Sequence, residues 1–221
     1  MPYQCDVIDP AKTVMLVIDM QNDFVAEGAT LRSAQAAAMV PRLSAALKTC
    51  REKGIRVIYT AHVHRRDGSD MGLYKDLHPS IADRSVLVDG TPGADIFKDL
   101  LPAPGEHIIR KHRYSAFFGT DLEIILREWG ITTVIISGTT TENCCHATAR
   151  DAMFRNYKVV FLSDATGAVD YPNVGQGAMS AEEVHHATLV ILAVSTAHVM
   201  TTAECLDRVR TLKGAANPRA A

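Results

Sequence analysis

Uninterrupted apolar runs recur along this chain, and the first of them ends abruptly in a carboxylate. Residues 14–18 read VMLVI and are followed by Asp19, and residues 132–137 read TTVIIS and are followed by Gly138. Short runs that are apolar at nearly every position are typical of parallel strands buried on both faces. The sequence therefore predicts, before anything else, a buried parallel sheet.

Helical patterns alternate with these runs. One extends to about Lys53, and Gly54 suits the position just after a helix. Thr120 and Glu123 have the spacing of a capping box, which predicts a helix from there to residue 130. Residues 62–93 are polar and interrupted by glycine and proline, so we expect a long, irregular excursion there. Strands are expected at 14–18, 55–60, 107–111, 132–137, 157–162 and 197–200 (a short edge strand), and further helices near 94–100, from near 144, at 181–192 and up to 209.

Strands that alternate with helices along the whole chain predict an α/β fold. The expected architecture is a doubly wound, mostly parallel six-stranded sheet of the Rossmann-like kind, with helices on both faces. The length fits a single domain, residues 1–221. In such sheets, ligands bind outside the carboxyl ends of the strands. Asp19, Lys111 and the 138–144 turn all fall at that end of different strands, so we expect one site there.

Composition excludes several classes of function. The formal net charge of −2 argues against a nucleic-acid partner, which requires a concentrated basic face. No apolar run approaches the roughly 20 residues of a membrane span, and the N-terminus lacks the pattern of a secretory signal. The five cysteines are irregularly spaced, which favours reduced, mostly buried thiols, one of which acts as a nucleophile. We therefore expect a cytoplasmic protein with no membrane partner.

The residues at the expected site have complementary chemistry. Cys144 falls in the first turn of a helix, where the partial positive charge favours a thiolate, and Lys111 would add a cation. Asp19 could accept the thiol proton and later return it to a leaving nitrogen. Backbone N–H groups of the 139–144 turn could hold an oxyanion. The alternative is purely structural: a core cysteine, a capping aspartate and a solvated lysine.

Three segments of the chain resemble the isochorismatase-like cysteine hydrolase superfamily, and the similarity extends over residues 13–210. That superfamily includes N-carbamoylsarcosine amidohydrolase, nicotinamidase, and ureidoacrylate and biuret amidohydrolases. The order and spacing of the Asp, Lys and Cys blocks match. The segments are VMLVIDMQNDFV at 14–25, HIIRKHRYSAFFGTDLE at 107–123 and VIISGTTTENCCHATARDAMFRNYKVVFLSDATG at 134–167.

The resemblance implies a fold and an activity. It makes Asp19, Lys111 and Cys144 a catalytic triad, and it places a cis peptide bond between Thr139 and Thr140. The oxyanion hole would consist of the backbone N–H groups of Thr140 and Cys144. Members of this kind cleave C–N bonds of small amides, ureides and carbamoyl compounds and form dimers or tetramers. Isochorismatases proper lack the cysteine, so Cys144 argues for amide chemistry.

The family pattern also distinguishes the two adjacent cysteines. A glycine precedes the nucleophile by six residues, and a helix reading ATAR[DE]A follows it; Gly138 and residues 147–152 therefore select Cys144. Cys145 falls where small apolar residues usually sit, so packing is its expected role. A binding or redox-responsive protein that uses the Cys144–Cys145 pair remains the alternative from a different class.

Substrate-binding candidates come from residues near the triad in sequence and from the start of the excursion. Aromatic residues that flank the triad are candidates to line a pocket, and histidine or arginine could recognise a substrate carboxylate or carbonyl. The candidates are Phe24, His62, His64, Arg65, Tyr114, Phe117 and Thr139.

A bound metal is a further alternative. Nicotinamidases hold a metal through Asp-x-His and another His, and the matching stretch here is His62-x-His64 with His78 beyond. The aspartate is missing, and Arg65 and Arg66 would oppose a cation. We therefore expect no metal and no cofactor, and the leading hypothesis is a cysteine-dependent amidohydrolase for a small-molecule substrate.

Overall fold

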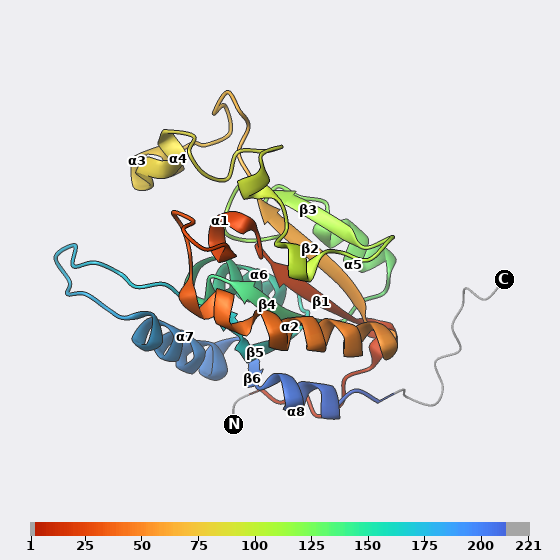
Figure 1. Ribbon diagram of the computed structural model, residues 1–221. Helices are drawn as coiled ribbons and strands as arrows, with labels where there is room; N and C mark the ends of the chain where they lie inside the picture. Colours follow the sequence, from red (N-terminus) through yellow and green to blue (C-terminus); the bar gives the residue numbers. More distant parts are fainter. Residues whose placement is uncertain (1–2, 211–221) are drawn as a thin grey trace.

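The computed structural model describes residues 3–210, and a six-stranded sheet runs through this range (Figure 1). The strand order is β3-β2-β1-β4-β5-β6, and every neighbouring pair is parallel, so the sheet is wholly rather than mostly parallel. The expected sheet is confirmed, with strand ends shifted by a few residues. The strands are β1 Thr13–Ile18, β2 Arg56–His62, β3 His107–Lys111, β4 Thr133–Thr139, β5 Lys158–Gly167 and β6 His198–Met200.

Helices cover both faces of the sheet, as expected for a doubly wound fold. They are α1 Asn22–Val25, α2 Ala34–Glu52, α3 Tyr74–Leu77, α4 Pro79–Ala82, α5 Leu122–Glu128, α6 His146–Phe154, α7 Ala181–Ser195 and α8 Thr202–Asp207, with short 3-10 turns at η1 Pro10–Lys12, η2 Pro92–Ala94 and η3 Lys98–Leu100 and a π-type turn at η4 Thr141–Cys145. Residues of α2 and α8 share one core cluster with the sheet, and residues of α5, α6 and α7 share the other.

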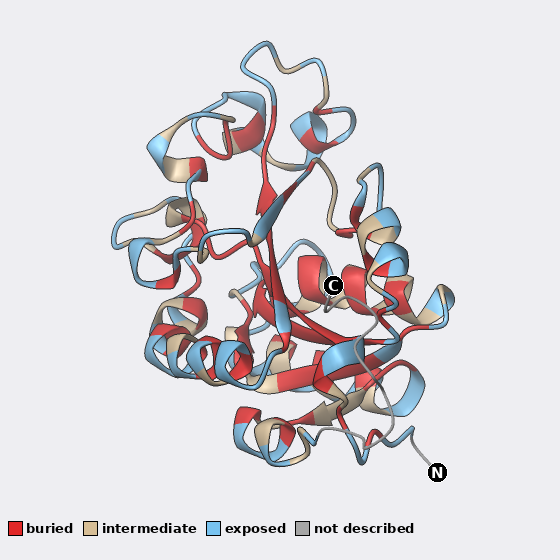
Figure 2. Cartoon of the chain, turned by 90° about the vertical axis from the view of Figure 1, so that its right-hand side faces the viewer, coloured by how far each residue is buried: buried red, intermediate tan, exposed pale blue. Residues whose placement is uncertain are grey.

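The central strand β1 divides its apolar residues between these two clusters. Met15 and Val17 pack on the α2 side, while Leu16 and Ile18 pack on the opposite side. This alternation follows from the two-residue period of a strand, and burial on both faces explains why the run is apolar at every position. Figure 2 shows the result: buried strands in the middle, and helices that are buried inward and exposed outward.

The helix expected near 94–100 is absent, and this prediction was wrong. Two single 3-10 turns occupy the stretch, and Ile96 between them forms an antiparallel bridge with Gln21. Two backbone hydrogen bonds flank that bridge: Asn22 N–H donates to Asp95 and Phe97 N–H donates to Met20. Pairing with the segment after β1 therefore replaces the local hydrogen bonds of a helix.

The capping box expected at Thr120 and Glu123 is also absent. Helix α5 begins at Leu122, and its N-cap residue Asp121 makes no side-chain cap hydrogen bond. The Glu123 carboxylate instead binds the guanidinium groups of Arg127 and Arg155. Glu123 does not cap the helix because its carboxylate forms two charge-assisted hydrogen bonds with arginines in the folded chain. Complete capping boxes occur at the starts of α7 and α8.

The excursion after β2 is largely irregular, as expected, with the single-turn helices α3 and α4 inside it. It extends beyond the carboxyl end of β2, where α3 and α4 stand clear of the sheet (Figure 1). The terminal segment GAANPRAA, which the sequence suggested would fray, lies outside the described residues. Among the helices of residues 3–210, none combines the length and apolar character needed to cross a membrane.

Candidate active site

The carboxyl ends of three parallel strands bring the three predicted catalytic side chains together. Asp19 follows β1, Lys111 is the last residue of β3, and Cys144 lies in the turn after β4. The Lys111 Nζ lies 2.6 Å from Asp19 Oδ2 and 3.4 Å from Cys144 Sγ. The side chains of Asp19 and Lys111 are fully buried, and Cys144 is 5% exposed. The sequence-based expectation of convergence at this edge agrees with these distances.

Close approach of β1 and β4 permits this arrangement. Gly138 pairs with Ile18 in the parallel register and has a positive φ of 113°. A Cβ atom at residue 138 would clash with the carbonyl oxygen of Ile18. Only glycine avoids the contact and adopts this backbone conformation without strain. The tight contact sets the distance between the end of β1, which carries Asp19, and the turn that carries Cys144.

Further hydrogen bonds fix the carboxylate and the ammonium. The Thr60 hydroxyl donates to Asp19 Oδ1 at 2.5 Å and accepts the Asp19 backbone N–H at 3.1 Å. Lys111 also donates to the carbonyl of Arg113 at 3.1 Å. Asp19 itself has a φ of 50°, which is uncommon for a residue other than glycine. The surrounding contacts thus hold these groups at fixed positions, as a preorganised site requires.

Burial determines the charge states in this group. Desolvation raises the pKa of Cys144 above its ordinary value, and the nearby Lys111 opposes that rise only in part. Burial thus outweighs the favourable effect that the sequence suggested for the helix turn and Lys111, and the pKa of the thiol lies above its ordinary value. Burial alone would lower the pKa of Lys111, but Asp19 and Cys144 raise it overall, so the amine stays charged.

The turn between β4 and α6 has the backbone form that the family resemblance implied. The peptide bond between Thr139 and Thr140 is cis. Residues 141–145 form the π-type turn η4, and regular α-helix begins at His146, two residues later than Cys144. The Thr139 hydroxyl donates to the carbonyl of Gly167 at 3.2 Å, so this side chain braces the turn against β5.

His62 joins the group from the end of β2. One ring nitrogen, a carboxylate oxygen of Asp19 and Cys144 Sγ all lie within 4.8 Å of one another. Gln21 fixes the backbone of His62, accepting its N–H at 2.8 Å and donating to its carbonyl at 3.0 Å. Burial, and then the charge of Lys111, lower the pKa of His62, so the imidazole is neutral. Its Nε2 has no hydrogen-bond partner.

Aromatic rings from the excursion pack over this end of the sheet. The Tyr74 ring lies 5.5 Å from the ring of His62 and 5.1 Å from that of Tyr114. The Tyr114 hydroxyl pairs with His78 Nε2 at 3.1 Å. Among the substrate-binding candidates, His62 and Tyr114 are therefore next to the catalytic group. Sequence reasoning missed Thr60, Gln21 and Tyr74. Thr60 lies near the carboxyl end of β2 and Gln21 lies shortly after β1, and this placement was the available signal.

Comparison with known proteins places this geometry in a family. The family model of the isochorismatase domain matches residues 13–204. This chain belongs to the isochorismatase family of hydrolases. It is 30% identical to nicotinamidase 3 of Arabidopsis thaliana, covering 96% of both chains, and 31% identical to a ureidoacrylate amidohydrolase RutB of Methylorubrum extorquens, covering 77% of this chain and 76% of the relative. A relative from Arabidopsis thaliana described as a "probable inactive nicotinamidase" is 36% identical over 71% of this chain and 81% of its own.

Solved structures of the family agree with the fold. A cysteine hydrolase from Pseudomonas syringae pv. phaseolicola superposes with a TM-score of 0.88 at 38% identity, covering 91% of this chain and 93% of its own. An N-carbamoylsarcosine amidase from Thermoplasma acidophilum superposes with a TM-score of 0.69 at 26% identity, covering 86% and 96%. The isochorismatase-like architecture expected from the sequence is confirmed.

Three further candidates for substrate binding in this isochorismatase-family chain have other contacts. Phe117 stacks on Tyr157 at 6.0 Å between ring centroids and is part of the core on the α5–α6 side. Phe24 is part of the opposite core cluster. Arg65 is exposed, and its backbone N–H donates to the carboxylate of Asp70. The core cluster of Phe117 also contains Cys144, and that of Phe24 also contains Tyr74, so a substrate contact by either ring stays a prediction.

The second cysteine of the pair has the packing role expected from the family pattern. Cys145 is fully buried in the α5–α6–α7 core, and all five cysteines of the chain are free thiols. Burial, and then the neighbouring Cys144, raise the pKa of the Cys145 thiol well above its ordinary value. A buried thiol of this kind is a poor redox centre, which weakens the redox alternative.

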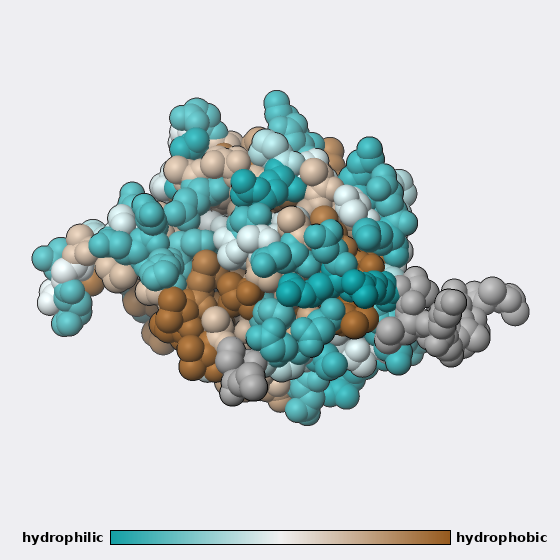
Figure 3. Space-filling model, turned by 90° about the horizontal axis from the view of Figure 1, so that it is seen from below, coloured by the Kyte–Doolittle hydropathy of each residue, from teal (hydrophilic) through white to brown (hydrophobic). Residues whose placement is uncertain are grey.

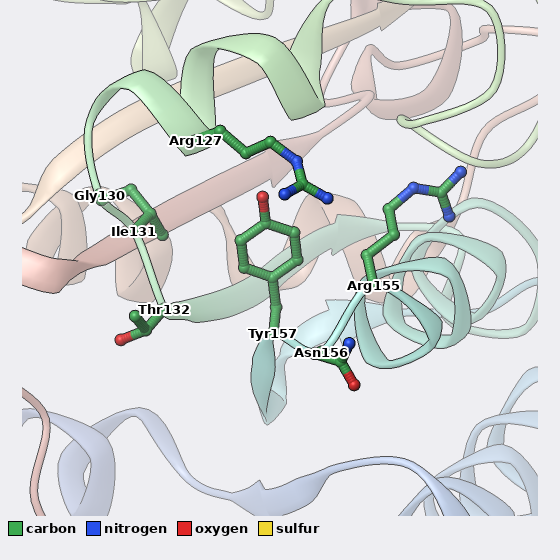
Figure 4. Close-up of a pocket in the computed structure, with 7 residues that line it drawn as sticks. All are labelled: Arg127, Gly130, Ile131, Thr132, Arg155, Asn156 and Tyr157. Atoms are coloured by element: carbon green, nitrogen blue, oxygen red, sulfur yellow. The ribbon is translucent and has the colours of Figure 1, made fainter.

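A cavity of about 350 Å³ lies at the opposite end of the strands from the catalytic group. It is lined by residues at the starts of β4 and β5, and Figure 4 shows Arg127 and Arg155 on either side of Tyr157. Glu123 binds both guanidinium groups and Asp151 binds that of Arg155, so two carboxylates balance the two positive charges. This cavity is remote from the reactive thiol and is not part of the candidate active site.

Proposed function

We propose that this chain hydrolyses the C–N bond of a small amide, ureido or carbamoyl compound through a thioester on Cys144. The observation that carries the proposal is the position of the Lys111 Nζ, 2.6 Å from Asp19 and 3.4 Å from Cys144 in a fully buried group. A nucleophile, a proton acceptor and a cation at one point are the requirements of acyl transfer. The relatives named ureidoacrylate amidohydrolase and N-carbamoylsarcosine amidase support this substrate class.

In the first half of the reaction, Asp19 takes the proton of the Cys144 thiol as Sγ attacks the carbonyl carbon. Because burial keeps the resting thiol protonated, this transfer accompanies the attack rather than preceding it. The backbone N–H groups of Thr140 and Cys144 stabilise the oxyanion, and Lys111 balances the negative charge. The C–N bond then breaks, and the proton on Asp19 passes to the leaving nitrogen, which departs as ammonia or an amine.

In the second half, water attacks the thioester carbonyl and gives a proton to Asp19. The C–S bond breaks, the acid departs, and the proton on Asp19 returns to Sγ. We propose that neutral His62 hydrogen-bonds the substrate or this water, because its Nε2 has no partner and one of its ring nitrogens lies within 4.8 Å of the Cys144 sulfur. We propose that Tyr114, whose ring packs against that of Tyr74, borders the substrate.

The test is ammonia release from a panel of small amides and ureides, with wild type and Cys144→Ala measured side by side. We expect release from one or a few compounds, reduced at least about a thousandfold in the variant. Trapping with a slow substrate should add the acyl mass to the peptide that contains Cys144. Equal rates for wild type and Cys144→Ala would disprove the mechanism.

A non-catalytic, ligand-binding member of the family is the second candidate. The relative described as inactive favours it, because the fold can persist without turnover. If wild type binds an amide of the panel in calorimetry but releases neither ammonia nor amine by mass spectrometry, this alternative replaces the hydrolase.

We also propose an assembly and a cellular compartment for this chain. We propose a homo-oligomer, dimer or tetramer, as the family resemblance implies. Helix α7 leaves Val190, Ile191 and Val194 about half or more exposed, and apolar surface gathers at this face in Figure 3. Light scattering would measure the mass. Five free thiols support a reducing compartment such as the cytoplasm.

A further inference from the structure

Two side chains just beyond β1 hold the segment by which the excursion returns to the sheet. We call this segment, residues 87–97, the return limb. Gln21 Nε2 donates to the carbonyl of Ala94 at 2.9 Å, and Asn22 Nδ2 donates to the carbonyl of Pro92 at 2.7 Å. The return limb is therefore tied to the end of β1 by side chains as well as by its backbone pairing.

Asp23 makes a third contact of this kind, at the start of the return limb. Its Oδ2 accepts the backbone N–H of Leu87 at 2.6 Å. The same carboxylate packs on Gly93 so closely that a Cβ atom at residue 93 would collide with both of its oxygens. Glycine at this position is therefore what lets the carboxylate reach Leu87.

Leu87 has a backbone conformation that depends on such a contact. Its φ is 56°, in the left-handed region that is unfavourable for residues other than glycine. Its N–H is held by Asp23, and its carbonyl accepts the backbone N–H of His64 at 2.7 Å. A conformation of this kind persists only where the surroundings enforce it, so these two hydrogen bonds mark Leu87 as an anchor point.

The pairing at this anchor point closes the excursion into a loop. His64, one of the substrate-binding candidates, forms a parallel bridge with Val88, and its carbonyl accepts the Asp89 N–H at 2.8 Å. Residues 65–86 therefore leave the body of the protein and rejoin it at one place. Asp23 holds the side on which they rejoin it.

The loop formed by residues 65–86 carries Tyr74 beside the catalytic group. The Tyr74 ring lies 5.5 Å from the ring of His62, and a ring nitrogen of His62 lies within 4.8 Å of the Cys144 sulfur. The Tyr74 hydroxyl is buried and makes no hydrogen bond, so packing alone holds the ring. The position of the ring therefore depends on where the loop is anchored.

Apolar side chains keep this loop folded without help from Asp23. Met71, Ile81 and Val86 belong to the core cluster on the α2 side of the sheet. Loss of the Asp23 contact should therefore shift the loop and loosen its base rather than unfold it.

We propose that Asp23 is a positioning residue of the active site. By holding Leu87 it fixes the base of the loop, and the loop in turn fixes the Tyr74 ring next to the catalytic group. Asp23 acts only through this backbone contact, whereas Asp19 is the proposed proton acceptor. The effect of Asp23 on catalysis rests on the proposed hydrolase, and its anchoring of the loop does not.

Amide hydrogen exchange of the full chain, read by mass spectrometry, tests the anchoring. Asp23→Ala should speed exchange at least about tenfold in peptides that cover residues 85–91 and leave β1 and β4 like wild type. Gly93→Ala, which displaces the carboxylate without removing it, should do the same. Asp23→Asn keeps an oxygen for the Leu87 N–H and should exchange like wild type. Wild-type exchange in both Asp23→Ala and Gly93→Ala would overturn the proposal.

A matched control removes a carboxylate that has no such contact. Asp121 is exposed and its side chain does not cap α5, so Asp121→Ala should leave exchange at residues 85–91 unchanged. Circular dichroism confirms that each variant is folded before it is measured.

Kinetics on the amide that the panel identifies test the positioning role. Asp23→Ala should raise KM about tenfold and lower kcat by no more than about threefold, because the ring beside the substrate moves while the catalytic triad keeps its contacts. Asp23→Asn should recover the KM of wild type. An unchanged KM in Asp23→Ala, or an equal loss in Asp23→Asn, would overturn the positioning role.

Alkylation of Cys144 by iodoacetamide gives an answer that needs no substrate. If wild type hydrolyses no compound of the panel, the proposed function fails by that result, and the labelling rate decides the role of Asp23. Asp23→Ala should be labelled at Cys144 at least about threefold faster than wild type, because a displaced Tyr74 ring uncovers the thiol. Equal labelling rates would overturn the proposal.

Discussion

At the scale of single residues, the central fact is a buried ion pair beside a thiol. Lys111 and Asp19 are fully buried and depend on each other, because either charge alone would lack a partner in a low-dielectric interior. The same burial keeps Cys144 protonated at rest. Activity and stability therefore share these atoms, and substitutions should affect both.

Lys111→Met should lower the free energy of unfolding by about 3–5 kcal/mol, because it leaves the Asp19 carboxylate buried and unpaired. The double variant Asp19→Asn with Lys111→Met should be more stable than Lys111→Met alone, since it removes the unpaired charge. Urea denaturation of the three proteins at neutral pH measures this. A double variant less stable than Lys111→Met would contradict the account.

At the scale of elements, the turn between β4 and α6 is held from three directions. Gly138 sets its distance from β1, the Thr139 hydroxyl ties it to β5, and His185 of α7 reaches it from the side. His185 Nε2 pairs with the carbonyl of Ser163 at 2.9 Å, so it carries the hydrogen, and Nδ1 accepts from the Thr141 hydroxyl at 2.9 Å. The position of the thiol thus depends on neighbouring elements.

Gly138→Ala should destabilise the protein by at least about 3 kcal/mol, or prevent folding, because a Cβ atom would collide with the backbone of Ile18 at a φ of 113°. Gly130→Ala is the control: it also has a positive φ, 63°, but its Cβ would meet nothing within 4 Å. Its cost should be only about 1 kcal/mol. Thermal and urea unfolding distinguish the two, and equal losses would refute the steric argument.

His185→Leu should lower kcat by about ten- to a hundredfold with little change in KM, because the turn that carries Cys144 loses its contact with α7. His185→Gln can still accept from Thr141 and donate to Ser163, so it should recover most of the rate. The kinetics use whichever amide the panel identifies. A loss in His185→Gln as large as in His185→Leu would rule out this positioning role.

At the scale of the whole molecule, several histidines are buried in neutral form. Burial lowers the pKa of His62, His64 and His185 below the ordinary 6.5. Below that pH the unfolded chain takes up protons that the folded chain does not, so the free energy of unfolding decreases as the pH falls. Burial raises the pKa of Glu142, and this carboxyl contributes in the opposite direction.

Stability should therefore fall between about pH 7 and pH 5.5, by at most about 1.4 kcal/mol per histidine for each pH unit below 6.5. Glu142→Gln removes the opposing contribution and should make the decrease at least as steep. Urea denaturation at intermediate pH values measures the slope. A free energy of unfolding that stays level or rises as the solution is acidified would contradict this reading of the buried histidines.

Sequence alone determined the sheet and the edge of it at which the candidate catalytic residues meet. Apolar runs reveal buried parallel strands because burial on both faces demands apolar residues at each position, and the residue that ends a run must then lie at the ligand-binding edge. This logic placed Asp19, Lys111 and the 138–144 turn at one edge, and the family resemblance selected Cys144 within that turn. Only the tertiary structure decided that Cys144 is a resting thiol, because desolvation depends on residues distant in sequence.

Tertiary structure likewise decided which neighbours of the triad matter. His62, distant from Cys144 in sequence, has a ring nitrogen within 4.8 Å of the Cys144 sulfur. Local patterns record the period and the end of an element, but not which side chains from different elements share a cavity. For the same physical reason the contact of Asp23 with Leu87 appears only once the excursion is packed against the end of β1.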